Sequence, residues 1–322
     1  MKLNNKNILI TGATGLVGSW LVERLIDANT LLGIALDPSQ DFLLESKNIM
    51  DKFDLIYTDI ASYSDLKKIF KNNSFDLVIH LAAQTQVGYA EISPIRTFES
   101  NIQGYWNILE LCRVNNTPLL NASSDKAYGS TQKLPYTELH ELNAIYPYEI
   151  SKAIADKLTQ SYIKTYNANV TTLRCGNIYG GGDLNWERLI PGVIKSLIMK
   201  DQPVLRSDGT FTCDWVYVED VAEAYEKIAF HMMEDNKKIF PFYNFSSPDY
   251  FSVIEIYKLL CNLVTGDFVE PKYEINSEYE IQDQKLDARK IKNDLGIEAS
   301  VSISEGLSKT FIWYKENVQY YG

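Results

Sequence analysis

The feature that most constrains the fold is a run of spaced glycines near the start of the chain. Asn7–Thr11 is a short apolar run that leads directly into Gly12-Ala-Thr-Gly15-Leu-Val-Gly18, and an amphipathic helical pattern follows. In such a turn the first glycine permits a tight bend, the second lets a diphosphate approach the backbone, and the third lets the helix pack on the strand. The helix N-terminus offers free N–H groups to the phosphates. The segment therefore predicts a strand–turn–helix unit that binds a dinucleotide.

An acidic residue after the second apolar run indicates which dinucleotide. Asp37 follows Gly18 by 19 residues, and no Lys or Arg appears between Asp37 and Lys47. A carboxylate here accepts hydrogen bonds from a ribose diol and repels a 2′-phosphate, which favours NAD over NADP. The alternative is a glycine turn followed by a surface aspartate. Asp59, after the third run, has two interpretations: a contact to the adenine amino group, or the N-cap of a helix over 63–71.

Short apolar runs alternate with helical patterns through the first 175 residues. Such runs, rich in Ile, Leu and Val, are typical of strands that are covered on both faces. Helical patterns, among them Val17–Ala28 and Ile102–Val114, separate them, which predicts βαβ units and a doubly wound, Rossmann-like parallel sheet in an α/β protein. The predicted strands are Asn7–Thr11, Leu31–Leu36, Asp54–Tyr57, Leu77–Leu81, Leu119–Ala122 and Val170–Arg174.

The pattern changes after Cys175. Three glycines (180–182) form a loop, and helices are expected over 191–199, 217–230, 252–264 and the last 20 residues. We expect an NAD-binding domain over 1–174, rejoined by about 214–243. A smaller mixed α/β substrate-binding part would consist of 175–213 and 244–322.

Charge and composition exclude several classes of function. Among 322 residues, Lys and Arg number 31 and Asp and Glu 42, so the net charge is −11. This acidity argues against nucleic acid or an anionic membrane as a partner. No apolar run reaches the roughly 18 residues of a membrane-spanning helix. The four cysteines lie far apart and the three histidines are scattered, so we expect no metal site and a cytoplasmic location.

Two segments supply candidate catalytic groups. Tyr148 and Lys152 are four residues apart and share one helix face. A nearby cation lowers the pKa of a phenol, so Tyr148 is a candidate acid/base, and Lys152 is free to hold the nicotinamide ribose. A core tyrosine beside a solvated lysine is the alternative.

The second segment follows the strand Leu119–Ala122, at the edge where open α/β sheets bind ligands. Ser124, Asp125 and Lys126 offer a hydrogen-bond donor, a general acid and a potential base. A polar turn closed by Gly129 is the alternative.

Together these motifs resemble the extended short-chain dehydrogenase/reductases, and more narrowly the nucleotide-sugar 4,6-dehydratases, CDP-glucose 4,6-dehydratase in particular. The resemblance extends from Asn7 to about Tyr314. Its specific part is Asp125-Lys126, because CDP-glucose dehydratases carry Asp-Lys there, most other dehydratases Asp-Glu, and related epimerases small or hydroxylic residues. Ser124 stands where the dehydratases usually have Thr. The motifs are GATGLVG, HLAAQ (80–84), SSDKAYG (123–129), YEISK (148–152) and LRCGNIYGGGD (173–183).

The resemblance implies a three-step reaction. Tyr148 takes the proton of the sugar 4-hydroxyl while hydride passes from C4 to NAD, and Ser124 hydrogen-bonds the same oxygen. Lys126, if burial keeps it neutral, removes the C5 proton. Asp125 protonates the departing 6-hydroxyl, so it must hold a proton through a raised pKa. The hydride then returns to C6.

The resemblance also implies binding residues. The cofactor residues are Gly12, Thr14, Gly15, Leu16, Val17, Gly18, Asp37, Asp59, Ile60, Leu81, Ala82, Ala83, Gln84, Tyr148 and Lys152. The substrate residues are Asn177, Arg188, Leu189, Val204 and Arg206. Cys213 and Gln282 stand where related enzymes hold the substrate diphosphate with arginines. Arg188 and Arg206, and more weakly Lys285, are candidates to compensate, unless they are solvated surface residues.

We expect a homodimer that pairs the helices over 94–114 and 148–166, with Tyr105 and Trp106 either at this interface or in the core. Two alternative functions remain open. One is a nucleotide-sugar epimerase or C4 dehydrogenase of the same superfamily, and the other is a non-catalytic NAD-binding protein.

Overall fold

The computed structural model describes residues 2–234, 239–274 and 281–321. Within these ranges a parallel sheet of seven strands has the order β10-β6-β5-β4-β1-β2-β3, and every neighbouring pair is parallel. The predicted doubly wound sheet is thus confirmed. Its strands are β1 (Asn7–Thr11), β2 (Thr30–Ala35), β3 (Asp54–Tyr57), β4 (Leu77–His80), β5 (Leu119–Ser124), β6 (Val170–Cys175) and β10 (Phe242–Phe245).

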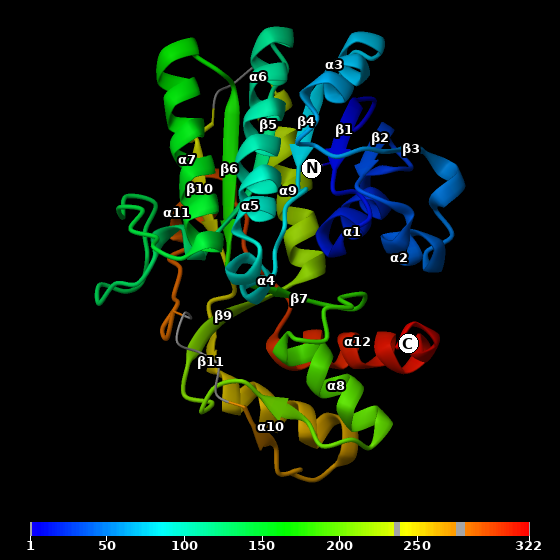
Figure 1. Ribbon diagram of the computed structural model, residues 1–322, viewed down its shortest axis with the longest axis vertical. Helices are drawn as coiled ribbons and strands as arrows, with labels where there is room; N and C mark the ends of the chain where they lie inside the picture. Colours follow the sequence, from blue (N-terminus) through cyan, green and yellow to red (C-terminus); the bar gives the residue numbers. More distant parts are fainter. Residues whose placement is uncertain (1, 235–238, 275–280, 322) are drawn as a thin grey trace.

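Helices cover both faces of this sheet (Figure 1). Two buried clusters of apolar side chains fill the spaces between the sheet and these helices. Coverage on both faces explains why the central strands are almost continuously apolar. The helices on one face are α1 (Leu16–Leu25), α9 (Val218–Met233) and α11 (Arg289–Leu295). Those on the other are α3 (Tyr63–Asn72), α6 (Tyr105–Asn115) and α7 (Pro147–Tyr166).

The helix predicted over Ile102–Val114 is not uniform. A π-helical turn, Glu99–Gly104, precedes α6, and Asn101 within it is buried. This side chain hydrogen-bonds the backbone of Gln84 and the hydroxyl of Ser151, contacts that helical periodicity does not reveal. Shorter helices are α2 (Phe42–Ser46), α4 (Val87–Ile92) and α5 (Pro94–Phe98), with 3₁₀ turns at Pro38–Gln40, Met50–Lys52, Asp125–Tyr128 and Val318–Tyr320.

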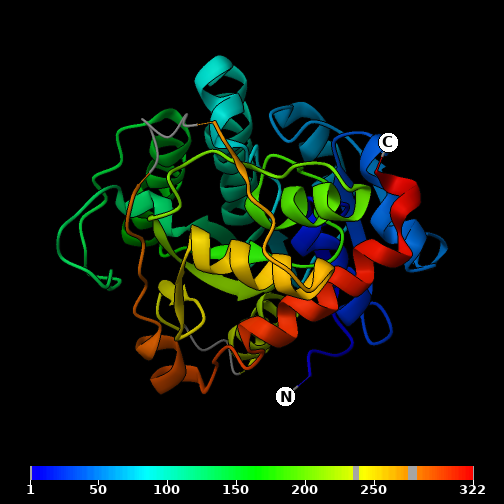
Figure 2. The same ribbon diagram turned by 90° about the horizontal axis from the view of Figure 1, so that it is seen from below.

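The remaining elements form a smaller part with its own apolar core below the carboxyl edge of the large sheet (Figures 1 and 2). Among the described residues, three strands pair in the order β11-β9-β7 and two more as β12-β8. The elements are β7 (Asn177–Tyr179), α8 (Leu189–Met199), β8 (Val204–Leu205), β9 (Thr212–Tyr217), β11 (Tyr250–Ser252), α10 (Val253–Thr265), β12 (Lys272–Tyr273) and α12 (Ile303–Glu316).

The glycine loop that follows β7 joins the two parts. Trp20 of α1 donates its indole N–H to the carbonyl oxygen of Gly181 over 3.1 Å. A Cβ at Gly181 would lie 2.3 Å from the Trp313 ring, and one at Gly182 would lie 2.0 Å from Leu43. Glycine is required here because side chains from both parts pack directly on the loop. Among the described residues, no helix combines the length and apolar character needed to cross a membrane.

Candidate functional site

The glycine turn has the shape of a diphosphate site. Gly12 has φ +71°, and its N–H donates to the carbonyl of Ile34 over 2.7 Å. A Cβ at Gly12 would lie 2.8 Å from the backbone nitrogen of Ala82, and one at Gly18 would lie 2.0 Å from the Gly12 oxygen. Gly15 is the N-cap residue of α1, and no side chain hydrogen-bonds the helix N-terminus there. A Cβ placed on Gly15 would meet only the Gly12 oxygen, at 3.4 Å. The first turn of α1 is therefore open to phosphate oxygens, so these residues fit a dinucleotide.

Asp37 lies just beyond β2, where the ribose contact was predicted. Its Oδ1 accepts the N–H of Ser39 over 2.8 Å, and hydrogen bonds from the Ser39 side chain and backbone hold the pKa of Asp37 below its usual value. The group is therefore a carboxylate at neutral pH. Lys47, the first cation after Asp37 in sequence, lies 3.5 Å over the Trp20 ring and pairs with Glu23. Lys47 thus contacts side chains of α1 and does not extend toward Asp37, which agrees with a site for NAD, whose ribose carries no 2′-phosphate.

The N-cap interpretation of Asp59 is wrong. Helix α3 begins after Ser62, which occupies the N-cap position. The Asp59 carboxylate instead accepts the N–H of Ala61 over 2.8 Å and lies 3.6 Å from a guanidinium nitrogen of Arg96. A local turn uses this side chain before the helix starts. The adenine contact of Asp59 and the adjacent buried Ile60 stays a prediction.

The segment Leu81–Gln84 leaves β4 beside the glycine turn. Before it, His80 is buried and shares a 2.7 Å hydrogen bond with the hydroxyl of Thr11. Burial lowers the pKa of His80 to about 3, so the ring is neutral. After it, Gln84 exchanges backbone hydrogen bonds of 2.7 and 2.9 Å with the Asn101 amide, which also donates to Ser151. Sequence reasoning missed Asn101, which lies in the π-helical turn just before the predicted helix and gave no periodic signal.

Tyr148 and Lys152 both point from α7 toward the end of β5. Each is more than nine-tenths buried. Burial raises the pKa of Tyr148, and the charges of Lys126 and Arg188 offset this in part. The predicted lowering of the pKa of Tyr148 is therefore wrong in direction, because desolvation of the phenolate outweighs the cations. Lys152 Nζ donates to the Ala122 carbonyl over 3.4 Å, and burial lowers the pKa of Lys152 to about 8.

The hydroxyl, carboxyl and amine predicted after β5 converge on Tyr148. Ser124 ends the strand and donates to Asp125 Oδ1 over 2.8 Å, and it hydrogen-bonds Tyr148 as well. Asp125 is 1% exposed, and its Oδ2 has no hydrogen-bond partner within the part of the chain that is described. Lys126 Nζ donates to Oε1 of Gln284 over 2.6 Å. Asp125 and Lys126 lie near enough to Tyr148 for their charges to act on the pKa of its phenol.

A buried polar network supports this arrangement from behind. Arg174 of β6 donates to Asp156 of α7 over 2.7 Å and to the hydroxyl of Tyr128 over 2.7 Å. Tyr128, which ends the 3₁₀ turn that contains Asp125 and Lys126, donates to Asn244 of β10 over 2.6 Å. The network thus ties the turn to the helix that carries Tyr148. Sequence reasoning identified neither Arg174 nor Asn244.

The two arginines proposed for the diphosphate meet at one loop. Arg188 donates to Asp183 over 2.8 Å and to the hydroxyl of Thr85 over 3.2 Å. Arg206 is exposed and donates to the carbonyl of Glu187 over 2.8 Å, which places it beside the residue that precedes Arg188. Both arginines therefore lie at the segment before α8, and Arg188, which is paired with Asp183, also reaches the loop after β4.

The structure also places Lys285, the two positions where related enzymes have arginines, and the other predicted substrate residues. Lys285 lies 3.9 Å over the Tyr250 ring, and Cys213 is a buried residue of β9. The exposed Gln282 contributes a backbone carbonyl to Thr212 rather than a charge. Asn177, Leu189 and Val204 begin β7, α8 and β8.

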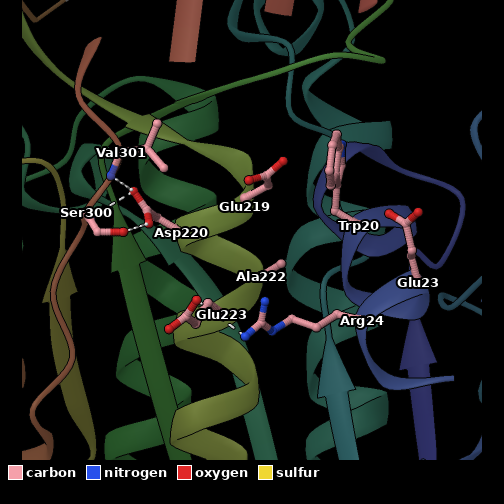
Figure 3. Close-up of a pocket in the computed structure, with 9 residues that line it drawn as sticks. All are labelled: Trp20, Glu23, Arg24, Glu219, Asp220, Ala222, Glu223, Ser300 and Val301. Carbon is pink, nitrogen blue, oxygen red and sulfur yellow. Dashed lines mark hydrogen bonds and ion pairs between the residues drawn. The ribbon is translucent and has the colours of Figure 1, made fainter. Parts of the chain in front are cut away.

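A separate cavity of about 310 Å³ lies between α1 and α9 (Figure 3). Its polar side chains are engaged in structural contacts: Asp220 accepts the backbone N–H groups of Ser300 and Val301, and Arg24 pairs with Glu223. None of the predicted site residues lines it. Among the described residues, no three His, Cys, Asp or Glu side chains are grouped so as to hold a metal ion.

Residues 8–241 match the model of the NAD dependent epimerase/dehydratase family. A trifunctional UDP-glucose 4,6-dehydratase/3,5-epimerase/reductase of Arabidopsis thaliana is 30% identical over 98% of this chain and 48% of its own. The chain thus spans about half the length of this relative and of two others like it. A CDP-glucose 4,6-dehydratase of Salmonella typhimurium is 26% identical over 96% of this chain and 90% of its own.

Among solved structures, that of a UDP-glucose 4-epimerase with UDP-glucose from Thermotoga maritima is 26% identical. It has a TM-score of 0.88 and covers 97% of this chain and 99% of its own. Dehydratases and epimerases are thus both among the similar proteins, and the resemblance to the extended short-chain dehydrogenase/reductases is confirmed. The chain belongs to the NAD dependent epimerase/dehydratase family, an enzyme family whose cofactor is NAD.

Proposed function

We propose that this chain is an NAD-dependent nucleotide-sugar 4,6-dehydratase, which converts a nucleoside-diphosphate hexose to its 4-keto-6-deoxy form. One observation carries the proposal. Asp125 and Lys126 lie together beside the Tyr148–Ser124 pair at the carboxyl end of β5. Oxidation at C4 needs a base for the hydroxyl proton, a role that Tyr148 with Ser124 can fill. An additional acid and base are needed when a proton must also leave C5 and water must leave C6, and Asp125 and Lys126 can supply them.

In this proposal Tyr148 and Ser124 serve the oxidation at C4. Bound NAD supplies the hydride acceptor. Tyr148 removes the proton of the 4-hydroxyl, and Ser124, which already hydrogen-bonds Tyr148, positions the same oxygen. Because burial raises the pKa of Tyr148, the phenol is protonated in the free protein at neutral pH and must first release this proton to solvent before it can act as the base. The charge of Arg188, and that of Lys126 while it is an ammonium, reduces the free energy needed to form the phenolate.

Asp125 and Lys126 serve the elimination. The Lys126 amine takes the C5 proton, the C–H electron pair forms the C5–C6 double bond, and the C6–O bond breaks. The departing oxygen takes a proton from Asp125 and leaves as water. The Asp125 side chain is 1% exposed, and its Oδ2 has no hydrogen-bond donor among the described residues, so this is the oxygen that would meet the departing 6-hydroxyl.

We assign the remaining predicted residues by position. The glycine turn, Asp37 and the segment Leu81–Gln84 would hold NAD, and Lys152 would hold its nicotinamide ribose. Arg188 and Arg206 would hold the substrate diphosphate in place of the missing arginines. The Asp-Lys pair makes CDP-glucose the first substrate to examine.

We also propose a homodimer through α6 and α7. Trp106 is 44% exposed on α6. Tyr105 is 1% exposed and hydrogen-bonds Thr159 of the same chain, so its interface interpretation is wrong. Burying Trp106 in a partner's α6–α7 surface would remove a large apolar side chain from water.

A second candidate is a C4 epimerase. The similarity to the Thermotoga maritima UDP-glucose 4-epimerase over nearly the whole chain favours it. An epimerase returns hydride to C4 and loses no water, so Asp125 and Lys126 would then have no chemical role.

The test is product analysis. The protein is incubated with NAD and, separately, CDP-glucose, UDP-glucose and dTDP-glucose, and the nucleotide sugars are analysed by mass spectrometry and NMR. We expect loss of one water (about 18 Da), a C4 ketone, a C6 methyl group and no net change in NADH. A C4-inverted sugar of unchanged mass would establish the epimerase instead. No conversion of any of the three sugars would contradict the proposal.

A further inference from the structure

Gln284 is a buried residue from a distant part of the chain that contacts the proposed base. Its Oε1 accepts a 2.6 Å hydrogen bond from Lys126 Nζ, across 158 residues of sequence. The Gln284 side chain is 4% exposed. It belongs neither to the short-chain dehydrogenase motifs nor to the predicted binding residues.

The strand-like segment around Gln284 is fixed on β9. Thr212 donates to the carbonyl of Gln282 and accepts the N–H of Gln284, both over 3.0 Å. Further along, the N–H of Leu286 donates to Asp214 over 2.6 Å. The segment therefore holds the Gln284 side chain in place before any substrate arrives.

The orientation of the Gln284 amide is also set. Its NH₂ group donates to the carbonyl of Ile281 over 3.0 Å. An amide that donates from nitrogen on one side presents its carbonyl oxygen on the other. Lys126 therefore meets a neutral acceptor, not a donor.

The charge of the Gln284 side chain matters because Lys126 must lose a proton before it can act as a base. Asp125 lies next to it in the same 3₁₀ turn, and α7 contributes Tyr148 and Glu149, whose pKa values both respond to Lys126. Burial raises the pKa of both groups, which favours their neutral forms. The segment packed on the other side contributes the Gln284 amide to Lys126 Nζ. A carboxylate at that point would favour the ammonium form of Lys126.

We propose that Gln284 is a positioning residue that holds the Lys126 side chain in place for removal of the C5 proton, and that its neutral amide stabilises the ammonium form less than a carboxylate would. This inference rests on the proposed dehydratase function. A neutral amine can donate one N–H to Gln284 and keep its lone pair for the proton on C5. An ammonium has no lone pair and cannot act as the base.

Gln284→Glu tests the inference, because it changes charge with little change in shape. We expect the acid limb of the dehydration rate to move about one to three pH units higher, the range for a close opposite charge. Oxidation at C4 should continue, so NADH should accumulate at neutral pH. The measurement is a single turnover across pH 6–10 with whichever of the three sugars the wild type converts. Absorbance at 340 nm reports oxidation and quenched mass spectrometry reports water loss.

Two further variants separate charge from structure. Gln284→Met removes the acceptor without adding charge, so dehydration should slow at every pH and the acid limb should not move to higher pH. Gln132→Glu makes the same chemical change on an exposed loop outside the site and should leave both readouts at wild-type values. Melting temperature and NAD affinity are measured for all three variants.

The experiment distinguishes a failure of the Gln284 inference from a failure of the proposed dehydratase function. If the wild type makes the 4-keto-6-deoxy sugar but Gln284→Glu keeps the wild-type pH profile, the inference alone is overturned. The same holds if Gln284→Met dehydrates at the wild-type rate. If the wild type dehydrates no sugar, the proposed function is overturned, and with it the role of Gln284.

Discussion

The side chains of the candidate site show how burial and neighbouring charge compete at single residues. Tyr148 and Lys152 are both more than nine-tenths buried, and burial shifts both toward their neutral forms. The charges of Lys126 and Arg188 act in the opposite direction on Tyr148, because a nearby positive charge favours the phenolate and lowers the pKa of the phenol. Their role is therefore to make the phenol easier to ionise than its burial alone would allow.

Tyr148→Phe removes the acid/base group and leaves the glycine turn intact. We expect the rate of C4 oxidation to fall by about 10²–10⁴-fold, the usual contribution of general acid–base catalysis. NAD affinity should be unchanged. Single-turnover absorbance at 340 nm and NAD titration measure the two quantities, and Tyr166→Phe, at the exposed far end of the same helix, is the control. Oxidation at the wild-type rate in the Tyr148→Phe variant would refute the assignment.

Asp125→Asn preserves the shape of the side chain but removes the acidic proton. We expect C4 oxidation to proceed and water loss to stall, so NADH and a 4-keto sugar of unchanged mass should accumulate together. Absorbance at 340 nm and mass spectrometry of a quenched reaction show this. Dehydration at the wild-type rate would instead mean that Asp125 is a turn residue.

At the scale of elements, a buried ion pair ties the sheet to the helix with the acid/base pair. Arg174 and Asp156 are 1% and 0% exposed, and the same guanidinium bonds Tyr128 at the end of the 3₁₀ turn. The rings of Tyr128 and Phe242 lie 4.8 and 4.6 Å from the Arg174 guanidinium carbon. The Arg174 side chain thus contacts three other elements: α7, the 3₁₀ turn and β10.

Arg174→Met should lower the free energy of unfolding by about 3–5 kcal/mol, because it leaves the Asp156 carboxylate buried without its partner. Urea denaturation followed by circular dichroism measures the change. Arg174→Met with Asp156→Leu replaces both charges and should recover part of the loss. If the double variant is no more stable than Arg174→Met, the isolated carboxylate is not the cause.

The whole molecule depends on contacts between the large sheet and the smaller part. Asp214 of β9 lies at this junction: it is 0% exposed and accepts the N–H of Leu286, and the Asp125 carboxyl acts on its pKa. Burial raises the pKa of Asp214 to about 8. Tyr250 and Lys285 are the other titratable groups that interact with it.

The raised pKa makes the stability of the fold depend on pH. An unfolded Asp titrates near 3.8, so between about pH 4 and 8 the folded protein binds more protons than the unfolded one. The contribution of Asp214 to stability is then largest below pH 4 and is lost as pH rises toward 8. Asp214→Asn, which mimics the protonated acid, should remove this dependence. Urea denaturation at pH 5, 6, 7 and 8 measures it, and a difference between wild type and variant that does not change with pH would contradict the argument.

Local patterns in the sequence predicted what depends on neighbouring residues. The glycines after β1, the alternation of strands and helices, and the Tyr148–Lys152 spacing each express geometry over a few residues, so the fold class and the NAD family followed from them. The ends of the six predicted strands were placed within two residues because apolar runs stop where the sheet meets solvent or a loop, whereas β10 and the strands of the smaller part were not predicted. The adjacency of Asp125 and Lys126 is likewise a property of the chain itself.

Only the tertiary structure decided the environment of these groups. The pKa of Tyr148 rises because distant elements exclude water from it, and the spacing to Lys152 contains no information about that exclusion. Gln284 reaches Lys126, and Arg174 reaches Tyr128, across long stretches of chain that leave no periodic signal. The sequence by itself determined which chemical groups follow each strand, whereas desolvation and long-range hydrogen bonds, which exist only once the chain is packed, determined how those groups ionise and which partners hold them.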